Sequence, residues 1–223
     1  MLVHIAKVLD SATLDAVKRT IDRLVFQDGG MTAGWHARTV KHNQQAAPSP
    51  ELGELQHVLV EALEAHPVFT ALTLPHRIAP PLLSRTGPGE TYGTHVDDAL
   101  IGAPARRIRT DLSVTIFLDA PESYEGGELA VDGPAGEESA KVPAGDAIVY
   151  PSTTLHRVMP VTAGERRVAV TWVQSLVRDA ATREMLFDLD RARRGIFEKD
   201  GKSEAFDLVS KSYANLLRRH AEI

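Results

Sequence analysis

The middle of the chain, from residue 75 to 175, constrains the fold more than any other feature of the sequence. Short runs rich in β-branched residues alternate there with turns made of Gly, Pro and Asp, and no helical pattern falls between them. This spacing is typical of an antiparallel sandwich or barrel. A parallel βαβ sheet is not expected, because no helical pattern falls between the runs to serve as a crossover. The candidate strands are 78–85, 91–97, 111–118, 128–131, 147–150, 156–161 and 166–174.

Helical patterns flank this segment on both sides. Before it, apolar residues recur every three or four positions in one stretch that Asp10 or Ser11 would cap and in another that starts after Pro50. After Ser175, two more amphipathic stretches are separated by the polar run EKDGKSE. We therefore expect a mainly β fold with flanking helices, divided into a main domain over residues 1–177 and a C-terminal two-helix extension over 178–223.

Composition narrows the chemistry that this fold can carry. The 223 residues include no cysteine, which excludes disulfides, thiolate-bound iron–sulfur clusters, Cys-based zinc sites and a Cys nucleophile. The formal net charge of -5 predicts no general attraction to nucleic acid or to an acidic membrane. The start MLVHIAKVLD lacks the features of a signal peptide, and no apolar run is long enough to span a bilayer. We expect a cytoplasmic protein, in a reducing compartment that suits ferrous iron.

Two metal-competent side chains stand close together in the stretch GTHVDDA. His95 and Asp97 are two residues apart in a predicted strand, so their side chains should point to the same face. A third ligand can come from a distant strand when a sheet closes on itself, and His156 in YPSTTLHRVMPV is the candidate. Two histidines and one carboxylate form the facial triad of non-haem Fe(II) oxygenases. A catalytic zinc site uses the same ligand types, so the triad alone leaves both metals open.

An arginine ten positions after His156 adds a second clue. Arg166 begins the next predicted strand after a short turn, and a hairpin would return it beside the strand that carries His156. The planar guanidinium can grip a carboxylate with two parallel hydrogen bonds. It would suit the far carboxylate of a 2-oxo acid that chelates iron through its other end. Arg167 should point the opposite way and cap the strand at the surface.

With His95, Asp97, His156 and Arg166 in this order, the sequence resembles the Fe(II)- and 2-oxoglutarate-dependent dioxygenases. More narrowly, it is similar to the PKHD-type hydroxylases, which are relatives of the prolyl and lysyl hydroxylases. The likeness runs over most of the chain. It is carried by the phrases YGTHVDDA, RTDLSVTIFL, YEGGELAV, PAGDAIVYPSTTLHRVMPVTAGERRVAVTWVQS and LFDLD.

The resemblance implies a double-stranded β-helix, or jelly roll, with supporting helices. It implies Fe(2+) ligation by His95, Asp97 and His156, and 2-oxoglutarate binding by Arg166. The family is also described as using L-ascorbate, which re-reduces the iron after uncoupled turnover. One residue departs from the pattern, because Asp98 stands where we would expect Asn. We expect its side chain to turn away from the metal, on the opposite face of the strand.

Two aromatic residues are further candidates for co-substrate binding. Trp172 has the same strand parity as Arg166 and would line the same pocket. Tyr92 is odd-spaced from His95, so it reaches the co-substrate only if a twist or bulge near Gly93 turns it. Both residues also fit an ordinary role as packed core aromatics. Nearby, Arg109 and Asp111 are expected to form a structural ion pair.

These residues predict an enzyme that uses 2-oxoglutarate and O2 to hydroxylate a peptide or small-molecule substrate, with release of succinate and CO2. A cupin-like metal enzyme without 2-oxoglutarate would share the triad but have no use for Arg166. A non-catalytic jelly-roll binding protein would not need a complete triad. Dealkylation of nucleic acid fits poorly, because the second arginine expected for it is replaced by Trp172. The amphipathic tail would pack on the barrel or join two copies of the chain in a homodimer.

Overall fold

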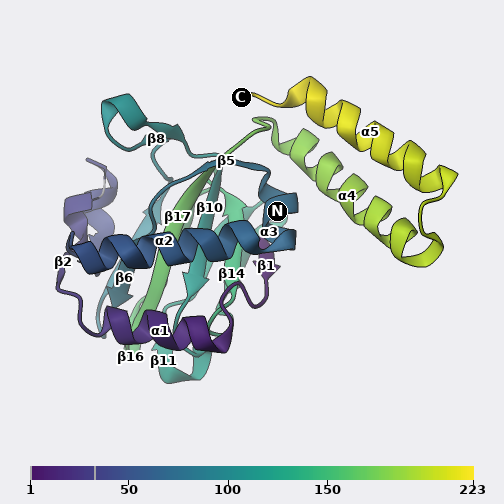
Figure 1. Cartoon of the computed structure of the whole chain (residues 1–223). Coiled ribbons are helices and arrows are strands. Elements are labelled where there is room, and N and C mark those ends of the chain that lie inside the picture. Colours follow the sequence, from purple (N-terminus) through teal and green to yellow (C-terminus); the bar gives the residue numbers. More distant parts are fainter. Residues whose placement is uncertain (1, 33) are drawn as a thin grey trace.

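The computed structural model describes residues 2–32 and 34–223, and most of its strands lie in two antiparallel sheets (Figure 1). The larger sheet has the order β1 (Val3–Ile5), β14 (Ala147–Pro151), β10 (Leu112–Phe117), β17 (Arg166–Ser175), β6 (Leu82–Thr86), β4 (Gln44–Ala46) and β2 (Phe26–Asp28), and β5 (Pro75–Ile78) also pairs with β17. The smaller sheet has the order β13 (Gly136–Ala140), β12 (Leu129–Gly133), β15 (His156–Val158), β7 (Thr91–His95) and β3 (Lys41–His42).

Shorter elements close the ends of these sheets. Two-stranded ladders pair β11 (Tyr124–Gly126) with β16 (Val161–Gly164) and β8 (Leu100–Ile101) with β9 (Ile108–Arg109). Single turns of 3-10 helix are η1 (Gly29–Thr32), η2 (Ala37–Val40), η3 (Pro104–Arg106) and η4 (Pro121–Ser123). The jelly roll expected from the sequence is therefore present, with more short strands than the sequence pattern showed.

The central strand β17 serves two cores because its side chains alternate between two faces. Ala169 and Val173 belong to a cluster with Leu59 and other residues of the first two helices. Val168, one position away, belongs to a second cluster with Tyr150 and with residues of the smaller sheet. One face of the larger sheet thus packs on helices, while its other face closes the space between the sheets.

Helices α1 (Ser11–Ile21) and α2 (Pro50–Ala65) lie across the outer face of the larger sheet, and α3 (Pro67–Thr73) follows α2 (Figure 1). The carboxylate of Asp10 accepts a hydrogen bond from the backbone N–H of Thr13 at 2.7 Å, which confirms the expected start of α1. The hydroxyl of Ser49 caps α2 in the same way, directly before a proline at the first helical position.

The C-terminal extension is a hairpin of α4 (Ala180–Asp200) and α5 (Glu204–His220), which projects from one end of the barrel (Figure 1). Val177 and Leu186 pack with Leu74 at its base. Arg109 forms the predicted ion pair with Asp111 at 2.6 Å, and it also binds the carboxylate of Glu222 at 3.0 Å. The extension therefore packs on its own barrel.

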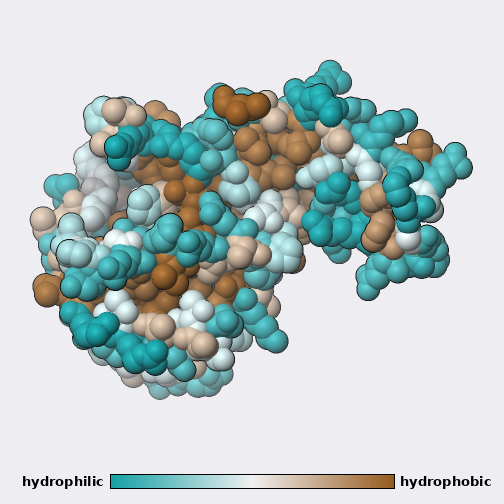
Figure 2. Space-filling view, viewed as in Figure 1, coloured by the Kyte–Doolittle hydropathy of each residue, from teal (hydrophilic) through white to brown (hydrophobic). Residues whose placement is uncertain are grey.

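Apolar side chains remain on the surface of this hairpin. Figure 2 shows brown areas along it, and Phe197 and Leu208 are each about half exposed. The homodimer expected through these helices stays a prediction. In the described part of the chain, no helix is both long and apolar enough to cross a membrane.

Three predicted strands are broken or end earlier than expected, whereas the bounds of the other four differ by one or two residues at the ends that changed. The strand expected over 78–85 is broken into β5 and β6, because Pro80 and Pro81 cannot donate to a ladder. The strand expected over 156–161 ends at Val158, and β16 starts only after Pro160. The strand expected over 91–97 ends at His95, which changes the account of the metal ligands given below.

Candidate metal and co-substrate site

The two imidazoles of the predicted triad face one another across neighbouring strands. His95 ends β7, and its register partner on β15 is His156. Each ring is held by a hydrogen bond at Nδ1, to the carbonyl of Gly93 at 2.8 Å and to that of Thr154 at 3.1 Å. A carbonyl oxygen only accepts, so both Nδ1 atoms carry the proton and both Nε2 atoms keep a lone pair for a metal.

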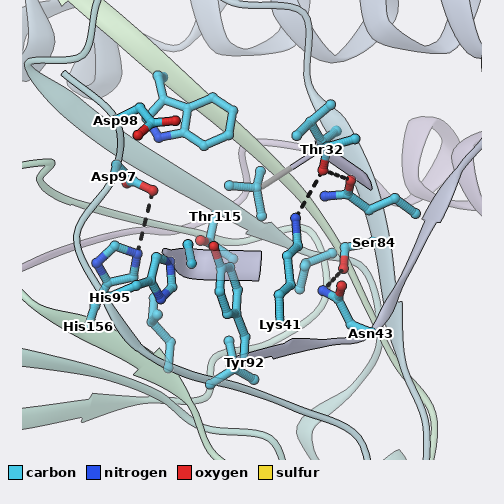
Figure 3. A pocket seen from close by; sticks show the side chains of 18 of the residues that line it. Thr32, Lys41, Asn43, Ser84, Tyr92, His95, Asp97, Asp98, Thr115 and His156 are labelled. Atoms are coloured by element: carbon cyan, nitrogen blue, oxygen red, sulfur yellow. Dashed lines mark hydrogen bonds and ion pairs between the residues drawn. The ribbon is translucent and has the colours of Figure 1, made fainter. Parts of the chain in front are cut away.

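The carboxylate of Asp97 completes the cluster. One ligand atom from each of the three residues lies within 4.8 Å of the others, and Nε2 of His156 is 3.8 Å from Oδ1 of Asp97. The other carboxylate oxygen accepts a hydrogen bond from the hydroxyl of Ser113, on the larger sheet, at 2.5 Å. Figure 3 shows the three side chains converging at one wall of a cavity. Within the described residues, no other group of three such side chains could hold an ion.

The strand argument for Asp97 is wrong in its reason, although the residue lies where it was expected. Because β7 ends at His95, both Asp97 and Asp98 lie in the connection to β8. That connection is anchored by the hydroxyl of Thr110, which donates to the carbonyl of Asp98 at 2.7 Å. The expected turn of Asp98 onto an opposite strand face is also wrong, because its carboxylate lines the cavity (Figure 3).

Burial sets the protonation states near the triad. Burial, and to a smaller extent the neighbouring His156, lower the pKa of His95 to about 4. The imidazole of His95 is therefore neutral at pH 7, as a metal ligand must be. Burial also raises the pKa of Tyr92, with Asp97 and Asp98 adding to the effect, so its hydroxyl stays protonated.

Arg166 lies in the same cavity, at the start of β17. Its side chain is 2% exposed, and its Nε atom has no hydrogen-bond partner among the residues that the structure describes. The hydroxyl of Tyr124 nearby is buried and without a partner as well. Burial lowers the pKa of the Arg166 guanidinium, whereas Tyr124 and Tyr150 raise it. Unmatched buried polar groups of this kind are suited to a ligand that accepts hydrogen bonds.

Arg167 takes the opposite role, as expected. Its backbone N–H and its guanidinium both donate to the carboxylate of Asp119, and the guanidinium also binds Asp22 of the α1 region at 2.7 Å. These contacts fix the start of β17 from outside. Arg166 is thereby directed inward by the alternation of the strand.

Both aromatic candidates line the cavity. The ring of Tyr92 stacks on His95 with centroids 3.6 Å apart and planes 13° apart. The register between β7 and β15 shifts between Tyr92 and His95. This is the bulge near Gly93 that Tyr92 was expected to need in order to face the cavity. Trp172 lies on the same side of β17 as Arg166, and its indole N–H is buried without a partner among the described residues.

Sequence reasoning missed Lys41 on β3, which also lines the cavity. Its side chain is 7% exposed, and its ammonium donates to the hydroxyl of Thr32 at 3.0 Å. Burial lowers the pKa of Lys41 to about 8, against the raising effect of Asp97 and Asp28, so the group remains charged at pH 7. No pattern in the sequence points to it, because β3 has only two residues.

Comparison with known proteins supports this assignment of fold and chemistry. The sequence matches the 2OG-Fe(II) oxygenase superfamily over residues 81–174 and the PKHD-type hydroxylase C-terminal domain over residues 180–222. It is 48% identical to a PKHD-type hydroxylase of Synechococcus elongatus over 223 residues, and 47% identical to one of Gloeothece citriformis over 222 residues. Each alignment covers all of this chain and all of the relative.

Solved structures share the fold at low sequence identity. A 2OG-Fe(II) oxygenase family oxidoreductase from Burkholderia pseudomallei is 19% identical with a TM-score of 0.57, and the match covers 78% of this chain and 84% of that one. A Pseudomonas putida prolyl-4-hydroxylase is 18% identical with a TM-score of 0.51, over 78% of this chain and 92% of the other. The full-length relatives, together with the His-x-Asp and His cluster, place the chain in the PKHD-type hydroxylases of the 2OG-Fe(II) oxygenase superfamily.

Proposed function

We propose that His95, Asp97 and His156 hold Fe(II), and that Arg166 binds the carboxylate of 2-oxoglutarate that is remote from the metal. The family and the triad imply both groups. The observation that carries the proposal is the buried guanidinium of Arg166. It lines the same cavity as the triad, and its Nε has no hydrogen-bond partner among the described residues. A cupin-like enzyme without 2-oxoglutarate would have no reason to bury such a cation beside its metal.

The protein's own contribution is to bind and orient these groups. The imidazoles present Nε2 because their Nδ1–H groups are tied to carbonyls, and Ser113 fixes the carboxylate of Asp97. We propose that Tyr92 and Trp172, which line the cavity, contact the co-substrate and exclude water from it. When bound, Fe(II) and 2-oxoglutarate supply with O2 the chemistry that hydroxylates a C–H bond and releases succinate and CO2.

Three finer assignments belong to this proposal. Residues 1–177 would form the dioxygenase domain and residues 178–223 an extension that packs on it. L-Ascorbate would serve as a reductant that restores Fe(II) after turnover without substrate. The hydroxylated substrate would be a peptide or a small molecule, and the non-catalytic alternative is not retained because the family is one of hydroxylases.

Co-substrate affinity tests the proposal directly. Anaerobic Fe(II) with 2-oxoglutarate should give a weak visible absorption band, whose titration yields the dissociation constant of 2-oxoglutarate. Replacing Arg166 by Met removes a buried charged donor, which typically costs about 2–5 kcal/mol, so the dissociation constant should rise by about 30-fold or more. His95→Ala should instead abolish metal binding. An Arg166→Met protein that remains folded and binds 2-oxoglutarate as tightly as the wild type would refute the role of Arg166, and a wild type that binds metal but gives no band with 2-oxoglutarate would favour the cupin-like enzyme.

A further inference from the structure

Lys41 is a buried cation that the proposed function does not use. Its ammonium has three N–H donors, and in the described ranges it makes one hydrogen bond, to the hydroxyl of Thr32. It also lies 5.2 Å from the centre of the Tyr92 ring. No carboxylate within the described residues comes within ion-pair distance of it, although Asp97 and Asp28 influence it from further away. Burial of a charge without an ion-pair partner destabilises the fold, which indicates that Lys41 has a role other than stability.

The other buried cations are accounted for. The side chains of Lys41, Arg166 and Arg183 are all less than 9% exposed. Arg183 donates to the carbonyls of Val177 and Arg178 at 2.8 Å each, and so helps to tie the C-terminal hairpin to the barrel. Arg166 is assigned to the co-substrate. Among the described residues that line the cavity, Lys41 has one hydrogen bond, to Thr32, and the ring of Tyr92 nearby, but no ion-pair partner and no assigned ligand.

Lys41 and Arg166 lie in different surroundings within one cavity. Burial lowers the pKa of both groups. Tyr124 and Tyr150 raise the pKa of Arg166, whereas Asp97 and Asp28 raise that of Lys41. Lys41 is the register partner of Tyr92 on the smaller sheet, and Figure 3 shows its ammonium beyond the Tyr92 ring, directed towards Thr32. The immediate neighbours of the two cations therefore differ, with Thr32 and Tyr92 beside Lys41 and the hydroxyl of Tyr124 near Arg166.

The charges of 2-oxoglutarate are already matched without Lys41. This inference rests on the proposed function, in which one carboxylate of the co-substrate lies at the metal and the other at Arg166. No anionic group of the co-substrate then remains for Lys41. We propose that Lys41 binds an anionic oxygen group of the primary substrate, so that the enzyme hydroxylates molecules that carry a carboxylate or a phosphate close to the reacting carbon.

The neighbours of Lys41 suit such a group. Thr32 and Gln45 are hydrogen-bonded to one another beside the ammonium, and Asn43 donates to the hydroxyl of Ser84 at 2.9 Å on the same wall. This wall of polar side chains also lines the cavity. The lysine ammonium is a compact point charge with rotatable donors, so it can bind either a carboxylate or a phosphate. The remaining N–H donors of Lys41 would meet the substrate oxygen atoms.

Small anions can probe the site before any substrate is known. The protein is loaded with Mn(II) and saturating 2-oxoglutarate, and trifluoroacetate or methyl phosphate is added in separate titrations. The Mn(II)-dependent relaxation of the 19F or 31P nucleus reports an anion bound near the metal. We expect saturable relaxation enhancement in the wild type with at least one anion, and binding weaker by about tenfold or more in Lys41→Gln and Lys41→Met, because a charged hydrogen bond is lost.

A matched control removes the same charge elsewhere. Lys199→Gln changes an exposed residue of α4, outside the cavity, and should bind the probes as the wild type does. Equal relaxation in the wild type and in both Lys41 variants would overturn the proposal. So would the lack of saturable enhancement by either anion in the wild type, a result that does not depend on how well the variants fold.

The titration of 2-oxoglutarate separates failure of this inference from failure of the proposed function. If Lys41→Gln melts close to the wild type but binds 2-oxoglutarate about tenfold more weakly, Lys41 holds the co-substrate and the inference is wrong. If the wild type does not bind 2-oxoglutarate at all, the proposed function itself fails. Preference for methyl phosphate over trifluoroacetate, or the reverse, would tell which anionic group the substrate carries.

Discussion

Gly127 is the residue whose replacement should disturb the seat of Arg166 most directly. Its φ angle is 69°, in the left-handed region, and a Cβ added to it would lie 2.9 Å from Cδ of Arg166. The same Cβ would lie 3.0 Å from Cγ2 of Val161 and 3.1 Å from Cε2 of Tyr124. All three contacts are closer than carbon atoms normally approach, and all three residues are buried. Gly127→Ala should therefore strain the backbone and push Arg166 at the same time.

A second glycine allows the two effects to be separated. Gly89 has a φ of 82°, but a Cβ there would meet nothing within 4 Å. Gly89→Ala should thus cost only the left-handed backbone term, about 1–2 kcal/mol. Gly127→Ala should add overpacking, typically about 1–3 kcal/mol, for a total of about 2–5 kcal/mol. For a chain of this size each kcal/mol corresponds to about 2–4 °C in the melting temperature.

Two measurements test this reasoning. Urea unfolding of the two variants should show a lower midpoint for Gly127→Ala at an unchanged denaturant slope. The dissociation constant of 2-oxoglutarate should rise by about tenfold in Gly127→Ala, since the guanidinium is displaced, and should stay at the wild-type value in Gly89→Ala. If the two variants are equally stable and bind 2-oxoglutarate equally well, Arg166 is not confined by Gly127, and the account of a preformed co-substrate seat is refuted.

Two further outcomes are expected. Gly53→Ala should stabilise the protein by about 0.5–1 kcal/mol, because Gly53 lies inside α2 with open space around it and alanine is the better helix former; a lower melting temperature would contradict this. Because the pKa of His95 is lowered on folding, the unfolded chain binds more protons than the folded one between pH 4 and 6.5. As the pH falls through that range, the free energy of unfolding of the metal-free protein should decrease by on the order of 3 kcal/mol because of this residue. Melting curves of the metal-free wild type and of His95→Gln check the second prediction, and an equal pH dependence in both would contradict it.

The core of the fold could be predicted from sequence because its strands carry strong local patterns. The β-branched runs of β10 and β17 are long, and their predicted bounds differ from the observed ones by one residue at each changed end. The strands β2, β3 and β4 could not be found in this way. Each has two or three residues, and each is a strand only because the edge of a neighbouring strand supplies its partners.

The same division applies to the site. His95, Asp97, His156 and Arg166 could be proposed as site residues because few residue types suit a metal or a carboxylate, and the structure places all four around one cavity. Asp98 was misplaced because β7 ends at His95, so the alternation of strand faces does not extend to residues 97 and 98. Lys41 was missed because the burial of a single lysine is a property of the assembled cavity.

The site draws on both sheets, and this arrangement explains why it should be ready to bind before any ligand arrives. The smaller sheet supplies His95, His156 and Lys41, while the larger one supplies Arg166 and the hydroxyl of Ser113 that holds Asp97. The distance between the sheets is fixed by close-packed side chains such as Tyr150, which lies in the core between them and is 2% exposed. Because the spacing is set by that core, we expect the proposed binding of metal and co-substrate to require little rearrangement of the barrel. If Lys41 binds the substrate as proposed, the polar wall around it would set specificity without disturbing the proposed metal ligands.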